Sequence, residues 1–222
     1  MSQIMKSVAI LFFILTLVLP NICTATDNLF EDIVANLVSD RPSNSPDIIK
    51  SLRQLSSQAE RNEDRLTAQI TLVLYLLDRD STDLAALDMA EPFRLCQEVI
   101  QTSPDTWQAQ LAKFYLALEP SYSGDFVHTV LRIQEADSLI NYGLLDGASH
   151  PALVAAKRIY TKGVDTSWRE VLLFAKAVAL CESNQIDEAE RILSLLASME
   201  YKKTIQNRIE LERSAQLKRL AR

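Results

Sequence analysis

Apolar residues recur along this chain at the three- and four-residue spacing of amphipathic helices, and short polar turns separate the apolar stretches. Start signals open several stretches: Ser-Pro-Asp at 45–47 and again at 103–105, and a capping box formed by Ser167 and Glu170. Pro92 predicts a break or kink, because an interior proline disrupts a helix. The pattern predicts about ten helices and no strand: residues 28–38, 46–59, 62–77, 83–101, 103–118, 125–142, 150–161, 168–181, a helix beginning near 187, and 201–220.

Many short helices joined by short loops favour an all-α fold of stacked antiparallel helix pairs, an α-solenoid, over a four-helix bundle. Residues 119–124 are expected to form a loop, and Gly143 and Gly147 to bracket the end of the helix over 125–142. The four glycines all lie between 124 and 163, which disfavours a protein of many hairpins. We therefore divide the chain into 1–25, a targeting segment; 26–45, a short helix and linker; 46–199, the helical domain; and 200–222, a basic C-terminal helix.

The first 25 residues resemble a secretory signal peptide in their layout. Lys6 precedes an uncharged run whose apolar centre, residues 8–19, has the length of a signal-peptide core and is short for a membrane span. Pro20 ends it, and Cys23-Thr24-Ala25 predicts cleavage after Ala25. The alternative is an uncleaved N-terminal membrane anchor. Lipidation of Cys23 is disfavoured, because Pro20 and Ile22 do not match a lipobox. We expect an exported protein, in the periplasm or on the extracytoplasmic face of the membrane.

Charge divides the chain into an acidic body and a basic end. Residues 26–199 hold 15 lysines and arginines against 26 acids, whereas residues 200–222 hold 7 against 3. An acidic body repels phosphate, so no nucleic-acid partner is expected. The terminal helix carries an apolar stripe, and we expect it to cap the stack with its basic side toward the acidic body. Contact with an anionic membrane is the alternative. The stripe consists of Ile205, Ile209, Leu217 and Leu220.

The stretch 168–201 resembles one tetratricopeptide (TPR) repeat, a helix–turn–helix unit of about 34 residues. Ala177 and Ala189 fall on the small positions of its two helices, and Leu180 and Leu193 on large apolar positions. The turn over 183–189 is similar to the turn of that family. The family's tryptophan position holds a different residue here, Leu173.

Two further parts of the chain resemble this repeat less closely. Tyr201 stands where the first unit would carry a proline. Residues 107–118 followed by 125–142 resemble a second unit, and 62–78 with 83–101 a third, but the starts are unevenly spaced and the helix at 150–161 lies outside the phase. What the resemblance implies is a TPR-like scaffold whose stacked hairpins bind peptides or other proteins.

The sequence contains no motif that specifies a reaction, a nucleotide or a metal. His128 and His150 lack metal-ligand spacing, so surface or capping roles are expected. The acidic run at 78–83 resembles a calcium loop only superficially, because Asp83 and Met89 replace the required glycine and glutamate. A Cys–His pair that meets only in space stays open as an alternative.

The remaining candidates are two cysteines and two tryptophans. Cys96 and Cys181 lie in apolar helical stretches, so two separate buried thiols are favoured over a disulfide. Trp107 and Trp168 each lie near a helix start, and packing between helices is favoured over a role as exposed anchors for a partner.

From these observations we expect a non-enzymatic, exported helical-repeat scaffold or adaptor that binds another protein or a peptide in the cell envelope. No catalytic, cofactor-binding or metal-binding residue is assigned, and no cofactor is expected. Membrane contact through the N-terminal segment or the basic C-terminal helix is an additional expectation. The alternatives are an enzyme or small-ligand carrier with a pocket between helices, and a membrane-tethered structural subunit of an envelope complex.

Overall fold

A computed structural model describes residues 46–77, 90–161 and 163–220. These residues all belong to one unit, Asn44–Arg222. The expected targeting segment, the expected helix at 28–38 and the acidic run at 78–83 lie outside the described residues.

Ten α-helices and one 3-10 helix account for most of the described residues, and no strand occurs among them, which confirms the all-α fold. Pro92 lies in the first turn of α4 (Ala90–Thr102), and residues 83–89, which the predicted helix also included, lie outside the described residues. The elements are α2 (Pro46–Gln58), α3 (Asn62–Leu77), α4 (Ala90–Thr102), α5 (Trp107–Leu118), η2 (Glu119–Ser123), α6 (Phe126–Asp137), α7 (Tyr142–Gly147), α8 (Pro151–Thr161), α9 (Trp168–Glu182), α10 (Ile186–Leu193) and α11 (Met199–Leu220).

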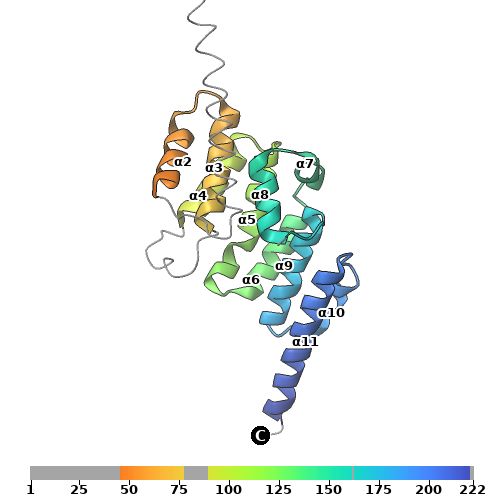
Figure 1. Ribbon diagram of the computed structural model, residues 1–222. Coiled ribbons are helices and arrows are strands. Elements are labelled where there is room, and N and C mark those ends of the chain that lie inside the picture. Colours follow the sequence, from red (N-terminus) through yellow and green to blue (C-terminus); the bar gives the residue numbers. More distant parts are fainter. Residues whose placement is uncertain (1–45, 78–89, 162, 221–222) are drawn as a thin grey trace, which may run out of the picture. The chain divides into compact units, whose positions relative to one another are not determined.

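Helices that follow one another along the chain pack in adjacent pairs (Figure 1). The pairs α2–α3, α4–α5 and α9–α10 are joined into one stack by contacts between α3 and α4, between α5 and α6, and between α6 and α9. α3 contacts α2, α4, α5 and α8, and every residue from Leu66 to Leu77 is buried. A helix that is apolar on all sides belongs in the interior, so α3 forms the centre of this part of the core.

α7 and α8 are an insertion in the stack, because α6 packs directly against α9. α8 contacts α3 and α9, and the ring of its Tyr160 lies 5.2 Å from that of Phe114 on α5. Ala152, Leu153, Ala155 and Ala156 bury the inner side of α8 at 2% exposure or less. α8 therefore lies across α3, α5 and α9, which explains why the helix at 150–161 is out of phase with the repeats.

The predicted start of α5 at Ser103 is wrong. The N–H of Ser103 still donates to Val99 (3.1 Å) in the last turn of α4, so this residue cannot cap the next helix. α5 begins at Trp107 instead, and the Thr106 hydroxyl caps it by accepting a hydrogen bond from Ala109 N–H (3.4 Å).

The single helix predicted over 125–142 is also wrong, because α6 ends at Asp137. The Ser138 hydroxyl donates to the Glu135 carbonyl (2.8 Å) and Ile140 N–H returns to Ala136 (3.0 Å), which closes the last turn. α7 then begins at Tyr142, so Gly143 and Gly147 lie inside a new helix. Residues 119–123 form a 3-10 helix where a loop was expected, and Gly124 ends it with φ 78°.

The hairpin of α9 and α10 places Ala177 and Ala189 at zero exposure, with Leu180 buried beside them. α11 covers this hairpin with Tyr201, Ile205 and Ile209, as expected of a cap. Its basic side faces the body: Arg208 pairs with Glu182, and Arg213 with Glu190 at 2.7 Å. The apolar stripe is buried only in its first half, since Leu217 is 68% exposed. Among the described helices none combines the length and apolar character needed to cross a membrane.

Candidate functional site

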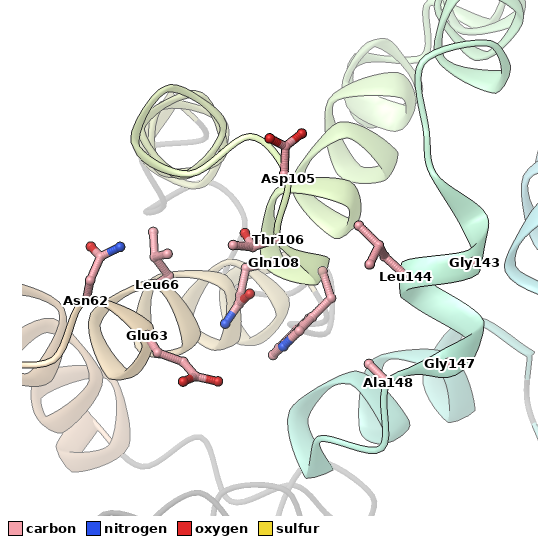
Figure 2. A pocket seen from close by; sticks show the side chains of 11 residues that line it. Asn62, Glu63, Leu66, Asp105, Thr106, Gln108, Gly143, Leu144, Gly147 and Ala148 are labelled. Carbon is pink, nitrogen blue, oxygen red and sulfur yellow. The ribbon is translucent and has the colours of Figure 1, made fainter.

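A cleft of about 700 Å³ opens between the beginnings of α3 and α5 and one side of α7 (Figure 2). Three elements meet here because α7 packs against α5 and α5 packs against α3. The lining combines carboxylates, an aromatic ring, small residues and a few apolar side chains. These residues are Asn62, Glu63, Leu66, Asp105, Thr106, Trp107, Gln108, Gly143, Leu144, Gly147 and Ala148.

Trp107 is the aromatic residue of the cleft. It is half-buried, and its ring stacks on His150 with centroids 5.1 Å apart and an interplanar angle of 28°. Nδ1 of His150 accepts a hydrogen bond from Ala152 N–H (3.2 Å) at the start of α8, which confirms the capping role expected of this histidine. Trp107 is thus fixed on one face by α8 while its side chain still lines an open cleft.

Trp168 has the opposite surroundings and confirms the expected packing role. It is completely buried, and its ring meets Phe114 edge-on at 5.1 Å. Its indole N–H makes no hydrogen bond with the described residues. Of the two tryptophans, only Trp107 lies where a partner can reach it.

The polar side chains of the cleft are two acids, two amides and the hydroxyl of Thr106, and none of the described lysines or arginines is among its lining residues. Glu63 and Asp105 are exposed. Gln108 is 2% exposed; its amide nitrogen donates to Thr67 Oγ1 (3.0 Å), and its amide oxygen accepts no hydrogen bond from any described residue. Figure 2 shows the Gln108 amide projecting into the opening toward Glu63. The cleft therefore offers hydrogen-bond acceptors and negative charge.

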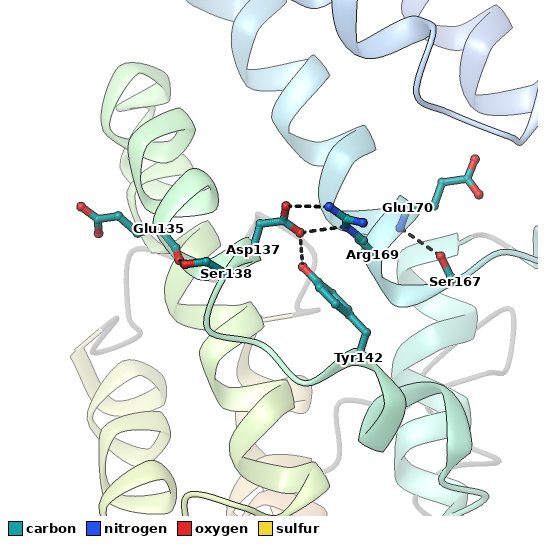
Figure 3. A network of polar contacts seen from close by, with 7 residues as sticks. All are labelled: Glu135, Asp137, Ser138, Tyr142, Ser167, Arg169 and Glu170. Atoms are coloured by element: carbon teal, nitrogen blue, oxygen red, sulfur yellow. Dashed lines mark hydrogen bonds and ion pairs between the residues drawn. The ribbon is translucent and has the colours of Figure 1, made fainter.

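A polar network holds α7, one wall of the cleft, against α6 and α9 (Figure 3). The Tyr142 hydroxyl donates to Asp137 (2.8 Å), and Arg169 donates to both oxygens of the same carboxylate (3.2 Å each). Burial raises the pKa of Asp137, but the bonds from Arg169 and Tyr142 outweigh it and hold the pKa below its ordinary value. At the far end of α7, Asp146 accepts from Trp168 N–H (3.2 Å). The wall is thus built in advance of any ligand.

The two other groups of candidate residues do not form a reactive centre. His128 is exposed on α6, where Nδ1 lies 2.6 Å from an oxygen of Asp125, in keeping with the expected surface role. Cys96 and Cys181 are buried and free, which confirms two separate thiols. Burial raises the pKa of both, so each stays protonated and unreactive. No group of three potential metal ligands occurs in the described part of the chain.

Sequence reasoning singled out Trp107 but missed its neighbours. Glu63 and Asp105 look like ordinary acids near helix starts, and Gln108 looks like any polar residue of a helix. Their common place along one cleft depends on the contacts between α3, α5 and α7, which leave no local signal. Comparison of the chain with family models, with curated proteins and with solved structures finds no match.

Proposed function

We propose that this protein is an exported, TPR-like scaffold or adaptor that binds another protein or a peptide in the cell envelope, without catalysis. The observation that carries the proposal is Trp107, a half-buried aromatic side chain in an open, acidic cleft. Aromatic side chains held in a fixed orientation are frequent anchors in protein interfaces. Export rests on the signal-peptide pattern of residues 1–25.

The position of α8 supports the cleft as the place of binding. Stacked helical hairpins commonly bind partners along a face of the stack. Here α8 buries four small or apolar residues against α3, α5 and α9. This side of the stack is therefore covered by the chain's own helix. The cleft at the beginnings of α3 and α5 is left open beside it.

Site-specific photo-crosslinking in the native envelope tests the proposal. A photoreactive residue replaces Ala148, at the rim of the cleft, or Leu195, which is 62% exposed beyond α10 and serves as the control. We expect one reproducible protein adduct from position 148 and its loss when Trp107→Ala is added. Adducts that are identical at both positions, or that persist without Trp107, would contradict the proposal.

Filling the cleft provides a second test that leaves Trp107 unchanged. A Cβ at Gly147 would meet no atom within 4 Å, so the position has open space for a side chain. Gly147→Leu should weaken capture of the crosslinked partner at least about tenfold, because it occupies the volume that the partner needs. Gly147→Ala is the matched control and should retain binding. Equal capture by both variants would place the partner elsewhere.

A further inference from the structure

We infer that the cleft recognises an arginine side chain presented by an extended segment of the partner protein. The inference rests on the proposed function, and it specifies which side chain of the partner the cleft binds. Three independent features of the lining carry it: its charge, its free acceptor and its aromatic ring.

Charge is the first feature. Glu63 and Asp105 supply two carboxylates, and the lining as described contains no basic residue, although Arg65 donates to Oδ1 of the lining residue Asn62 (2.6 Å). Residues 26–199 carry 26 acids against 15 basic residues, so the long-range field of the body also attracts a basic segment. An anionic ligand is disfavoured although two helices begin here, because these carboxylates already lie beside the helix starts and Thr106 accepts from Ala109 N–H.

The free acceptor is Gln108. Its side chain is almost completely buried, and its position is fixed by the hydrogen bond to Thr67. The amide oxygen accepts nothing from the described residues, and it is not one of the buried atoms that lack a partner, so it stays accessible to a donor from the cleft. A ligand that brings N–H donors into the cleft satisfies this oxygen. Glu63 lies on the side toward which the Gln108 amide projects, whereas the Asp105 side chain points away from both (Figure 2).

The aromatic ring favours a guanidinium over an ammonium group. Arginine is planar, stacks on indole rings and carries five N–H donors, whereas lysine is a compact and strongly hydrated point charge. Trp107 is held by its stack on His150, so its orientation is set before a ligand arrives. Leu144, which is half-buried, provides apolar surface for the aliphatic part of an arginine side chain. At about 700 Å³ the cleft also has room for neighbouring residues of the segment.

Peptide pools with one fixed residue test the inference on the mature protein. The fixed residue is arginine, lysine or citrulline, an uncharged analogue of arginine, and randomised neutral residues surround it on immobilised nonapeptides. We expect the arginine pool to retain the protein at least about tenfold better than the citrulline or lysine pool. Glu63→Gln with Asp105→Asn should remove this preference. Glu135→Gln with Asp165→Asn, the same charge change at exposed positions, should preserve it.

The outcomes separate this inference from the proposed function. If the pools bind equally, or if lysine matches arginine, selection of arginine is overturned while peptide binding stands. If no pool binds although position 148 still yields its Trp107-dependent adduct, the inference also fails. If no pool binds and position 148 yields no adduct, both the inference and the proposed function fail. Because citrulline changes only the peptide, the comparison holds even if the double variant folds poorly.

Discussion

Trp107 and Trp168 each begin a helix, yet one lines an open cleft and the other lies at the centre of the core. The sequence predicts both as packing residues, and for Trp168 this is confirmed. Nothing near either residue distinguishes them, because the partners that decide their burial are distant in sequence: Phe114 for Trp168 and His150 for Trp107. At the scale of residues, burial in helices could be predicted from periodicity, whereas membership of the cleft could not.

At the scale of residues, removing the hydroxyl of Tyr201 and removing that of Tyr142 should have different effects on stability. Tyr201 is buried and stacks on Phe174 at 4.2 Å, but its hydroxyl has no hydrogen-bond partner among the described residues. Tyr201→Phe should therefore leave the free energy of unfolding unchanged or raise it by up to about 1 kcal/mol. Tyr142→Phe, the matched control, removes the bond to Asp137 and should lower it by about 1 kcal/mol. Urea unfolding followed by circular dichroism measures both, and a larger loss in the Tyr201 variant would refute the prediction.

At the scale of elements, several helix starts followed from the sequence because their signals are local. The Ser167 hydroxyl caps α9 by accepting from Glu170 N–H (3.2 Å), as predicted. The carboxylate of Glu170, however, accepts hydrogen bonds from the N–H groups of Ala197 (2.7 Å) and Ser198 (2.5 Å), at the start of α11. The capping-box motif identified the cap but not this second role, which depends on tertiary packing.

Glu170 links α9 to α11 in a pH-dependent way. Burial raises its pKa, but the bonds from Ser198, Thr166 and Ala197 prevail and hold the pKa below its ordinary 4.5. Its contribution to stability is therefore complete above about pH 5 and is lost as the pH falls through the lowered folded pKa. Glu170→Gln should lower the free energy of unfolding by about 1 kcal/mol at pH 7 and flatten the acid side of its pH profile. Glu135→Gln, at an exposed position of α6, is the control and should leave the profile unaltered. An unaltered profile in the Glu170 variant would contradict the prediction.

The uneven burial of α11 predicts which C-terminal truncations the protein tolerates. Its first half buries Tyr201, Ile205 and Ile209 on the hairpin of α9 and α10, whereas Leu217 is exposed. A chain ending at Ser198 exposes the apolar side of that hairpin and should aggregate or lose its cooperative unfolding. A chain ending at Gln216 should unfold within about 0.5 kcal/mol of the full chain. Equal solubility and stability of the two would show that α11 is no cap.

At the scale of the whole molecule, the described helices form a stack of helical pairs into which α7 and α8 are inserted. The all-α fold and the pairing followed from helix lengths and short loops. The sequence showed only that the helix at 150–161 does not follow the spacing of the repeat-like units. It did not show where this helix packs, because periodicity does not reveal the partners of a helix. The cleft results from that packing, so it could not be predicted from the sequence either.

The signal-peptide pattern of the N-terminal segment yields a prediction about processing. Cleavage after Ala25 should give a mature protein that begins at Thr26, because small residues stand at the expected positions before the cut. N-terminal sequencing of protein from the envelope measures this. Ala25→Arg should block processing and leave the longer form. A native protein that begins upstream of Val8 would establish the uncleaved anchor instead.

The placement of α8 also has a consequence for the order in which the molecule forms. Neighbouring pairs such as α2–α3 and α9–α10 close short loops and can form early. α8 contacts α3, which lies far earlier in the chain, so we expect α8 to dock only after α3 and α5 have come together. We therefore expect the cleft at Trp107, whose ring stacks on the residue that caps α8, to be completed late in folding.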